Sequence, residues 1–324
     1  MRPFRYHRPA SSADALTALG APDSVAFGGG TDLLVTMKEG LAEPAHLVDV
    51  RHLRGARDIT VRADGSARIG GGVRIADLAA HGVIRERFAA LAEAAGLVGT
   101  PALRNMSTIA GNLCQRPRCW YYRQGFGLLA MKDGKSLVPD GANLYHAIFG
   151  GGPAYFVSAS SLGPALVALG AKIKLVSAKG PREVPAASFF VAPQDETSRE
   201  IALHPDEILT EIMIPAGAVR SATYEVRQRE VLDWPLVTAS VVLHMRGNVV
   251  ASAKVVMGYV ACKPWDSAEA AKALAGKAIT AETAEGAGKA AVSSAQPLSQ
   301  NAYKVTLARV AVKRALLEAA KQKA

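Results

Sequence analysis

The chain has 324 residues, 49% hydrophobic and 20% charged, which predicts a globular protein of two or three domains with an ample core. Its net charge of +10 is spread without a block of five basic residues, and only 6% of residues are aromatic, so a nucleic-acid-binding surface is not indicated. No apolar run approaches the roughly 18 to 20 residues of a membrane span, and three cysteines, an odd number, argue against a disulfide framework.

Strand-like and helical segments alternate in the first half of the chain. They are a serine-capped helix at 11–19, a strand, glycine turn and helix at 24–40, a buried strand at 46–50, and a hairpin at 58–72 that turns at Asp64-Gly65. The apolar rhythm from Arg74 to Gly96 predicts one long amphipathic helix, the longest of this half.

A polar, aromatic and glycine-rich passage from about Leu103 to Gly152 follows, and then the alternation resumes. The expected elements are a strand-like run at 154–159, a helix at 161–170, a strand at 171–178 and a strand at 206–215 that Pro215 stops. After Pro215 the pattern becomes an antiparallel meander with a hairpin at 246–248, and from Ser267 it becomes alanine-rich and helical. Strands followed by a helix cluster predict an α+β fold.

The stretch VAFGGGTDLLV, Val25 to Val35, is the first candidate ligand site. Consecutive glycines let backbone N–H groups converge without a Cβ in the way, and a helix N-terminus behind them adds positive potential, which suits a diphosphate. Position 33 is Leu and no Gly-Lys-Ser/Thr follows, so neither the dinucleotide fingerprint nor a Walker loop is present. A glycine turn without a ligand fits this stretch equally well.

The stretch TPALRNMSTIAGN, Thr100 to Asn112, is the second candidate. It follows a predicted helix and is rich in hydroxyl, amide and glycine residues, so it offers many hydrogen-bond donors to a polar ligand.

The two stretches together resemble the FAD-binding subunit of the molybdenum hydroxylases, of the xanthine dehydrogenase, aldehyde oxidoreductase and CO dehydrogenase flavoprotein type. GGGTDLL is followed by LRNMSTIAGN, SLGPALVALGA, DEILTEIMIP, YEVRQREVLDWPLVTASVVL and PLSQNAYKV, in order along the whole chain. The resemblance implies a two-subdomain, vanillyl-alcohol-oxidase-like (PCMH-type) FAD-binding domain at 1–216, with a subdomain joint within about the first 60 residues. It also implies a smaller C-terminal domain of antiparallel sheet plus helices at 217–324.

The resemblance places FAD between the subdomains, with its diphosphate on Gly28 to Asp32 and Leu209 near the isoalloxazine ring. The cofactor-binding residues that it implies are Phe27, Gly28, Gly29, Gly30, Thr31, Asp32, Leu33, Arg104, Thr108, Gly111, Asn112, Gln115, Arg118, Ser161 and Leu209. Arginines at 104, 116 and 118 could neutralise the diphosphate or meet acidic partner surfaces, or they could be solvent-facing. No catalytic residue is implied.

The implied function is electron transfer within a larger oxidoreductase. Substrate would be hydroxylated at a molybdopterin cofactor on a large partner subunit. Electrons would pass through [2Fe–2S] clusters on a small partner to FAD on this chain, and then to an external acceptor. We expect a heterotrimer or a dimer of heterotrimers in the cytoplasm, without nucleic acid or a membrane span. A chain exported together with a signal-bearing partner would have the same sequence.

The sequence departs from the family pattern at two positions near the expected site. Many relatives have an aspartate where this chain has Ser161, so one ribose or ribityl contact is replaced or lost. Some carry a lysine where this chain reads Tyr224-Glu225, which puts the acceptor properties in doubt.

The insertion from Leu113 to Ala154 is the third departure. In a subset of the family such a loop holds a [4Fe–4S] cluster, which ordinarily needs four thiolates. Here only Cys114 and Cys119 are present, Cys262 lies elsewhere, and His146 is the one candidate substitute ligand. We therefore expect no metal, and a loop whose Trp120-Tyr121-Tyr122 run packs it against the flavin domain or a partner.

Two other functions remain open. A stand-alone FAD oxidoreductase of the same fold, such as an enolpyruvyl reductase, would need a proton donor near the flavin, and no such residue stands out. A non-enzymatic assembly subunit without flavin would explain Ser161 and the missing cluster ligands, but the GGGTD and STIAGN motifs are intact.

Overall fold

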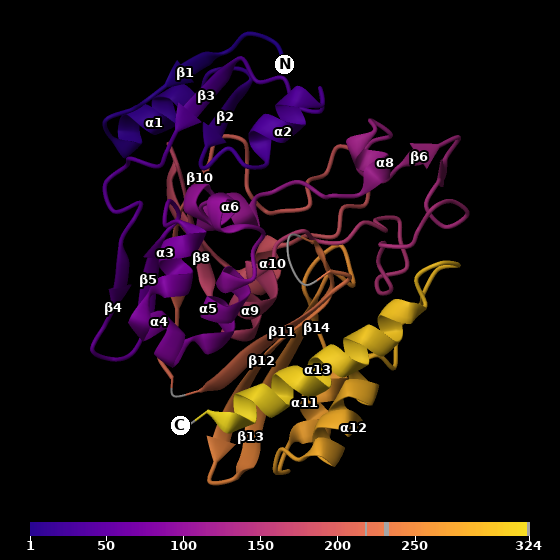
Figure 1. The fold of residues 1–324 in the computed structure, drawn as a ribbon. Coiled ribbons are helices and arrows are strands. Elements are labelled where there is room, and N and C mark those ends of the chain that lie inside the picture. Colours follow the sequence, from indigo (N-terminus) through magenta and orange to yellow (C-terminus); the bar gives the residue numbers. More distant parts are fainter. Residues whose placement is uncertain (218, 230–232, 323–324) are drawn as a thin grey trace.

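The structure, a computed structural model, describes residues 1–217, 219–229 and 233–322. Figure 1 shows three sheets in succession, with the N-terminal sheet at the top, a five-stranded sheet beneath it, and a four-stranded sheet covered by the C-terminal helices at the bottom. The α+β class predicted from the sequence is confirmed.

The N-terminal unit is a small parallel sheet with two helices. Its elements are β1 (Arg5–His7), α1 (Ser12–Leu19), β2 (Ser24–Phe27), α2 (Leu33–Lys38) and β3 (His46–Asp49), with strand order β1-β3-β2. The side chain of Ser11 caps α1 by accepting from the N–H of Asp14 at 3.1 Å. Because β2 and β3 are parallel, the chain leaves β2 at the same edge where it leaves β3, and the glycine loop lies at that edge.

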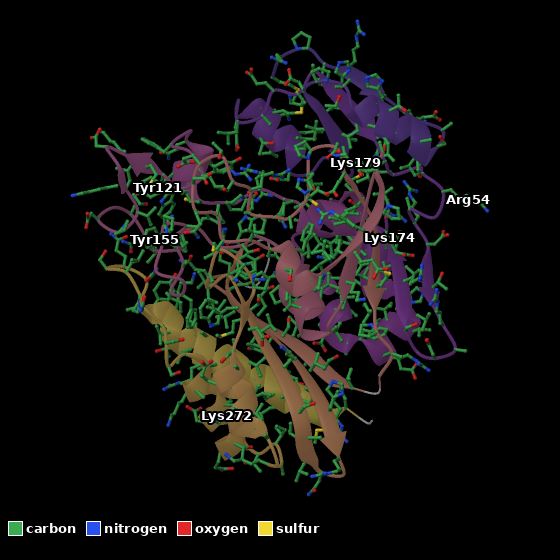
Figure 2. All side chains as sticks on the ribbon, turned by 180° about the vertical axis from the view of Figure 1, so that it is seen from behind. Arg54, Tyr121, Tyr155, Lys174, Lys179 and Lys272 are labelled. Carbon is green, nitrogen blue, oxygen red and sulfur yellow. The ribbon has the colours of Figure 1, made fainter. Side chains whose placement is uncertain are left out.

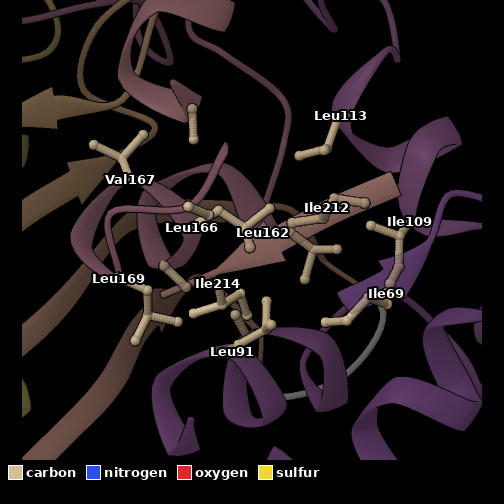
Figure 3. Packing of buried hydrophobic residues seen from close by; sticks show 14 of the residues in the cluster. Ile69, Leu91, Ile109, Leu113, Leu162, Leu166, Val167, Leu169, Ile212 and Ile214 are labelled. Atoms are coloured by element: carbon tan, nitrogen blue, oxygen red, sulfur yellow. The ribbon is translucent and has the colours of Figure 1, made fainter. Parts of the chain in front are cut away.

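The five-stranded sheet is antiparallel and forms the centre of the molecule. Its strands are β4 (Ile59–Val61), β5 (Ala67–Gly70), β8 (Lys172–Ser177), β9 (Gly180–Pro185) and β10 (Ile208–Ile214), in the order β4-β5-β10-β8-β9. Alternate residues of its inner strands, such as Ile69, Ile173 and Ile212, are buried on one face. Figure 3 shows Ile212 and Ile214 packed between Leu162 and Leu166 on one element and Leu91 on another.

The single long helix predicted from Arg74 to Gly96 is wrong. The chain forms three short helices there, α3 (Ile75–Ala80), α4 (Gly82–Arg87) and α5 (Ala89–Gly96). The helical geometry breaks at His81, where ψ is 114°, and at Phe88, where φ is −131°. These two breaks reorient the chain so that Leu78, Ile84 and Leu91 are all buried in one cluster, which a straight helix would not allow.

A largely irregular segment follows and contains only short elements. These are α6 (Pro101–Met106), α7 (Ile109–Leu113), α8 (Trp120–Arg123), the hairpin β6 (Met131–Lys132) with β7 (Lys135–Ser136), and, after it, α9 (Leu162–Ala168) and α10 (Ala186–Phe189). The strand-like run at 154–159 forms no strand, because single hydrogen bonds fix it instead. Tyr155 O accepts from the N–H of Ala147 at 2.8 Å, and Ser158 N–H donates to Ala261 O at 2.9 Å. In Figure 2, Tyr121 and Tyr155 mark this side of the molecule.

The C-terminal unit is the predicted meander followed by helices. It consists of β11 (Arg220–Arg227), β12 (Pro235–Arg246), β13 (Val249–Gly258), β14 (Trp265–Asp266), α11 (Ala268–Leu274), α12 (Ala281–Ala291) and α13 (Tyr303–Lys321), with strand order β11-β12-β13-β14. Helix α13 packs on the sheet through small, fully buried residues spaced one turn apart, Ala308, Ala311, Ala315 and Ala319. Among the helices that the structure describes, none has the length and apolar character to traverse a bilayer.

Candidate functional site

Two adjoining cavities lie where the N-terminal unit meets the five-stranded sheet and the start of the insertion. The first, which we call the glycine cavity, has a volume of about 250 Å³ and is lined by Gly28 to Leu33 on one side and Ile208-Leu209 on the other. The second, the Asn112 cavity, has about 140 Å³ and includes Asn112, Arg118 and Ser161. Because Thr31, Asp32, Gly111 and Gln115 line both, the two form one elongated recess.

The glycine loop that follows β2 lies directly on the backbone of the second motif. A Cβ at Gly29 would stand 2.0 Å from Met106 O, and a Cβ at Gly28 would stand 2.9 Å from Thr108 Oγ1. Gly30 has a φ of +73°, in the left-handed region that glycine adopts without strain. The close approach of the two motifs therefore depends on the glycines.

The same loop presents unused hydrogen-bond donors. None of the N–H groups of residues 28 to 32 donates to a backbone acceptor elsewhere in the described chain. Successive backbone N–H groups on a concave wall without Cβ atoms are a recurring binding site for anions such as phosphate. These residues fit the diphosphate of the implied FAD.

Hydrogen bonds hold the polar side chains of the second motif in place. Thr108 Oγ1 accepts from the N–H of Gly111 at 3.1 Å. The buried Asn112 accepts through Oδ1 from Ser160 Oγ at 2.8 Å and from the N–H of Leu162 at 3.3 Å. Asn112 thus ties the recess to the start of α9.

Asp32 connects the glycine loop to the insertion. Its carboxylate accepts from the N–H of Arg116 at 2.7 Å and lies 3.0 Å from Arg118 Nη2 and 2.9 Å from Arg123 Nη2. The Asp32 side chain is only 13% exposed, so these contacts are shielded from water. The carboxylate is therefore engaged in holding the insertion.

The structure brings most of the sequence-predicted residues together on the recess. Those that line the glycine cavity are Gly28, Gly29, Gly30, Thr31, Asp32, Leu33, Thr108, Gly111, Gln115 and Leu209, and those added by the Asn112 cavity are Asn112, Arg118 and Ser161. Within the described chain, Phe27 and Arg104 line neither cavity. Phe27 is buried beneath the Arg51 guanidinium, 5.2 Å from its ring centroid, and Arg104 donates to Val98 O and Gly99 O.

Arg51 lines the glycine cavity, and sequence reasoning missed it. Its guanidinium donates to both carboxylate oxygens of the buried Asp49, at 2.9 and 2.8 Å. Burial raises the pKa of Asp49, but hydrogen bonds from Arg51 and Tyr6 outweigh that effect and lower the pKa to about 2. The signal was the sequence Asp49-Val50-Arg51 at the end of β3, at the edge where the glycine loop also lies.

Ser161, which occupies a position where an aspartate was expected, is oriented by a tyrosine. Its Oγ lies 2.8 Å from Tyr259 Oη, and that hydroxyl donates to Ala159 O at 3.0 Å. Tyr259 has a φ of +62° and was not identified from the sequence, since it lies 98 residues from Ser161.

Glu225 forms a buried ion pair behind the Asn112 cavity. Arg227 donates to its carboxylate and also to Leu97 O. Burial raises the pKa of Glu225 to about 7, with Arg227 opposing the rise. Leu97 lines the Asn112 cavity, so this pair lies within one residue of it.

Cys114 lies apart from the other two cysteines, since Cys119 and Cys262 both belong to the cluster around Phe156. Cys114 packs against the central core, and burial raises the pKa of its thiol to about 12. Cys119 Sγ lies 3.1 Å from His146 Nε2, while Cys262 belongs to a buried cluster with Phe156. In the described residues, no group of three or more His, Cys, Asp or Glu side chains is arranged to hold a metal ion.

The aromatic run of the insertion mainly folds the insertion onto itself. Trp120 Nε1 donates to Ala142 O at 3.0 Å, and Tyr121 Oη accepts from the N–H of Ala142 at 2.8 Å. Tyr122 lies under the Arg116 guanidinium, 5.1 Å from its ring centroid, and packs on the cluster that contains Phe156.

Comparison with known proteins gives consistent matches over the whole chain. Residues 2–217 match the family described as the FAD binding domain in molybdopterin dehydrogenase, and residues 222–319 match the CO dehydrogenase flavoprotein C-terminal domain. The chain is 31% identical to the aldehyde oxidoreductase FAD-binding subunit of Escherichia coli strain K12, over 99% of this chain and 100% of that one. It is 29% identical to the carbon monoxide dehydrogenase medium chain of Hydrogenophaga pseudoflava, over 97% and 96%. A solved structure of that dehydrogenase, in a form without the Mo-pyranopterin moiety, matches with a TM-score of 0.78 at 27% identity, covering 100% of both chains.

Proposed function

This chain belongs to the family of FAD-binding subunits of molybdopterin dehydrogenases, and on that premise we propose that its FAD occupies the recess formed by the glycine cavity and the Asn112 cavity. The observation that carries the proposal is the glycine loop. Its N–H groups at 28–32 make no backbone hydrogen bond within the described chain, and its glycines lie against Met106 and Thr108 at distances that no Cβ would permit.

FAD accepts electrons and passes them on, so the redox chemistry belongs to the cofactor. The residues of this chain bind and orient it. We assign the diphosphate to the loop at 28–32, and Arg51, paired with Asp49, forms part of the same cavity wall. Asn112 and Ser161 form polar walls of the adjoining cavity, and Leu209 contributes an apolar wall on β10. Asp32 and Gln115 hold the insertion against the cleft through Arg118.

The domain division we propose has a boundary near residue 216, with a joint in the first 60 residues. It is supported by the three-stranded sheet that ends at Asp49 and by the five-stranded sheet that begins at Ile59. The glycine cavity lies at the junction between the three-stranded sheet and the five-stranded sheet.

We further propose that the chain works in a complex with a large molybdenum-cofactor subunit and a small [2Fe–2S] subunit, as a heterotrimer or a dimer of heterotrimers. The relatives' names, medium chain and FAD-binding subunit, support membership of a multi-subunit enzyme. Three unpaired cysteines support a reducing, cytoplasmic location.

The proposal is tested on the complex purified with its partner subunits. We expect the visible spectrum of a flavoprotein and one FAD per chain released on denaturation. A protein that releases no FAD would overturn the proposal. Molybdenum and iron contents of the complex test the partner assignment separately.

A pair of glycine variants tests the location of FAD. Gly29→Ala would place a Cβ 2.0 Å from Met106 O and force the two motifs apart, so we expect most of the FAD to be lost. Gly82→Ala is the matched control, because its Cβ would meet nothing within 4 Å and its backbone is not left-handed. Equal FAD content in the two variants would contradict the assigned site.

A further inference from the structure

A third cavity, which we call the aryl pocket, lies between the insertion and the C-terminal unit. It has a volume of about 210 Å³. The insertion contributes Trp120 and Tyr145 to its wall, and the C-terminal unit contributes Trp234 and Tyr259. It adjoins the Asn112 cavity, with which it shares Arg118, Asp233, Trp234 and Pro235. It is therefore continuous with the proposed flavin recess, while Trp120, Tyr145 and Phe156 line the aryl pocket and neither cavity of that recess.

Five of the described residues that line the aryl pocket are Phe, Tyr or Trp. The rings of Trp120 and Tyr145 meet edge to face with centroids 5.6 Å apart, and Phe156 adds a further aromatic side chain to the wall. On the opposite side, Arg118 Cζ lies 4.8 Å from the ring centroid of Trp234. Ring faces and edges at several angles around a small space favour a planar aromatic guest.

The polar groups of the pocket favour a neutral guest. Among the described residues that line the pocket, the arginine is Arg118, which lies 3.0 Å from Asp32, and the carboxylate is Asp233, which pairs with Arg229 at 3.4 Å. His146 is held neutral, because burial lowers its pKa to about 4. Both charged side chains among the described lining residues are therefore paired, which disfavours a phosphate or a carboxylate. Tyr145 Oη donates to Gln228 Oε1 at 3.3 Å, which leaves the N–H₂ group of Gln228 to donate to a carbonyl oxygen.

The pocket is held from behind by one buried amine. Lys304 Nζ donates to Tyr145 O at 3.2 Å and His146 O at 3.0 Å on the insertion, and to Tyr259 O at 2.6 Å on the C-terminal unit. Asn301 Nδ2 donates to His146 O at 3.1 Å as well. Both walls are therefore fixed before any ligand binds, which lowers the conformational entropy lost on binding.

We propose that the aryl pocket binds a small, neutral, planar aromatic molecule that carries a carbonyl oxygen. A volume of about 210 Å³ is below the roughly 300 to 1,000 Å³ of pockets for drug-sized ligands, so it admits one or two rings and not a dinucleotide. Two sources share this chemistry, a quinone and an aromatic ketone or aldehyde. Its test is distinguishable from that of the proposed function, because Trp120 and Tyr145 line neither cavity of the flavin recess.

Tryptophan fluorescence reports directly on this pocket. Two of the three tryptophans, Trp120 and Trp234, line it, and Trp265 is stacked on Phe149 at 4.6 Å elsewhere. The probes are 1,4-naphthoquinone for a quinone, acetophenone for an aromatic ketone and benzoate for an anion. We expect saturable quenching and binding heat with at least one neutral probe, and at least tenfold weaker binding of benzoate.

Variants assign the binding to the aryl pocket. Trp120→Leu and Tyr145→Ser should each weaken the bound probe at least tenfold in calorimetry, while Trp265→Phe leaves the affinity unchanged. FAD content should be unchanged in the Trp120 and Tyr145 variants, because neither residue lines the flavin recess. Circular dichroism establishes that each variant is folded. The absence of saturable binding, or equal weakening by Trp265→Phe, would overturn the proposal.

Discussion

Replacing Asp32 by Asn should loosen the insertion without changing the shape of the side chain. Asp32 accepts from the N–H of Arg116 and lies within 3.0 Å of the guanidinium groups of Arg118 and Arg123. An asparagine keeps one acceptor oxygen and turns an N–H₂ group toward positively charged donors. Arg118 and Arg123 contact Oδ1 and the Arg116 N–H contacts Oδ2, so the amide group faces at least one donor and all three contacts lose the negative charge.

The size of the effect follows from the burial of these contacts. Hydrogen bonds to charged groups contribute about 1.5–3 kcal/mol each, and the side chains of Asp32 and Arg123 are only 13% and 12% exposed. The Arg118 side chain is 26% exposed, so screening by solvent reduces the contribution of its contact with Asp32 to stability. We expect Asp32→Asn to lower the free energy of unfolding by about 2–4 kcal/mol.

Urea unfolding and limited trypsin digestion measure the two consequences. The exposed hairpin of β6 and β7 carries Lys132 and Lys135, so faster cleavage there reports a loosened insertion. Asp266→Asn is the matched control, because its pair with Lys254 is 36% and 54% exposed and should contribute about 1 kcal/mol or less. The reasoning is refuted if the two variants lose the same stability and are cleaved at the wild-type rate.

Three further predictions concern buried groups. Lys304→Met should cost about 2–4 kcal/mol in urea unfolding, since Tyr145 O and Tyr259 O lose their donor. Burial lowers the pKa of Lys304 from its usual 10.5 to about 7. The free energy of unfolding of the wild type, relative to this variant, should therefore rise as the pH increases from 7 to 10.5, and this gain should be lost once the pH has fallen to 7. Burial raises the pKa of Glu225 to about 7, so its contribution to the free energy of unfolding is present below pH 4.5 and is lost as the pH rises through 7. The urea midpoint of Glu225→Gln should not show this decline with pH. Leu162→Ala should cost about 3–4 kcal/mol by the same measurement, because Leu162 is fully buried between helix and sheet (Figure 3).

The sequence indicated the candidate site and predicted several strands correctly where local residue pattern and residue chemistry indicate the same structure. The glycine loop and the STIAGN segment each had a physical reason to bind a polar ligand, and the structure places both on one recess. Alternation in β8 and β10, and the hairpin between β12 and β13, also followed local rules.

Local sequence pattern did not predict the structure where contacts between residues far apart in the sequence determine it. The apolar periodicity of residues 74–96 continues through His81 and Phe88, so the sequence predicts one helix. The breaks at these two residues follow from the packing of the three helices into the central cluster. Ser161 and Tyr259 meet across 98 residues, which no periodicity encodes. The insertion lacks any repeat and is folded by individual hydrogen bonds, so its aryl pocket could not be foreseen from its cysteines.

The Lys304 amine has a consequence for the timing of biosynthesis. It donates a hydrogen bond to the carbonyl oxygen of His146, which lies 158 residues earlier in the chain, and Asn301 Nδ2 donates to the same oxygen. A ribosome therefore completes the insertion long before it makes the residues that secure it. Until helix α13 has been synthesised, the wall of the aryl pocket that belongs to the insertion lacks its anchor, so this pocket is completed late in synthesis.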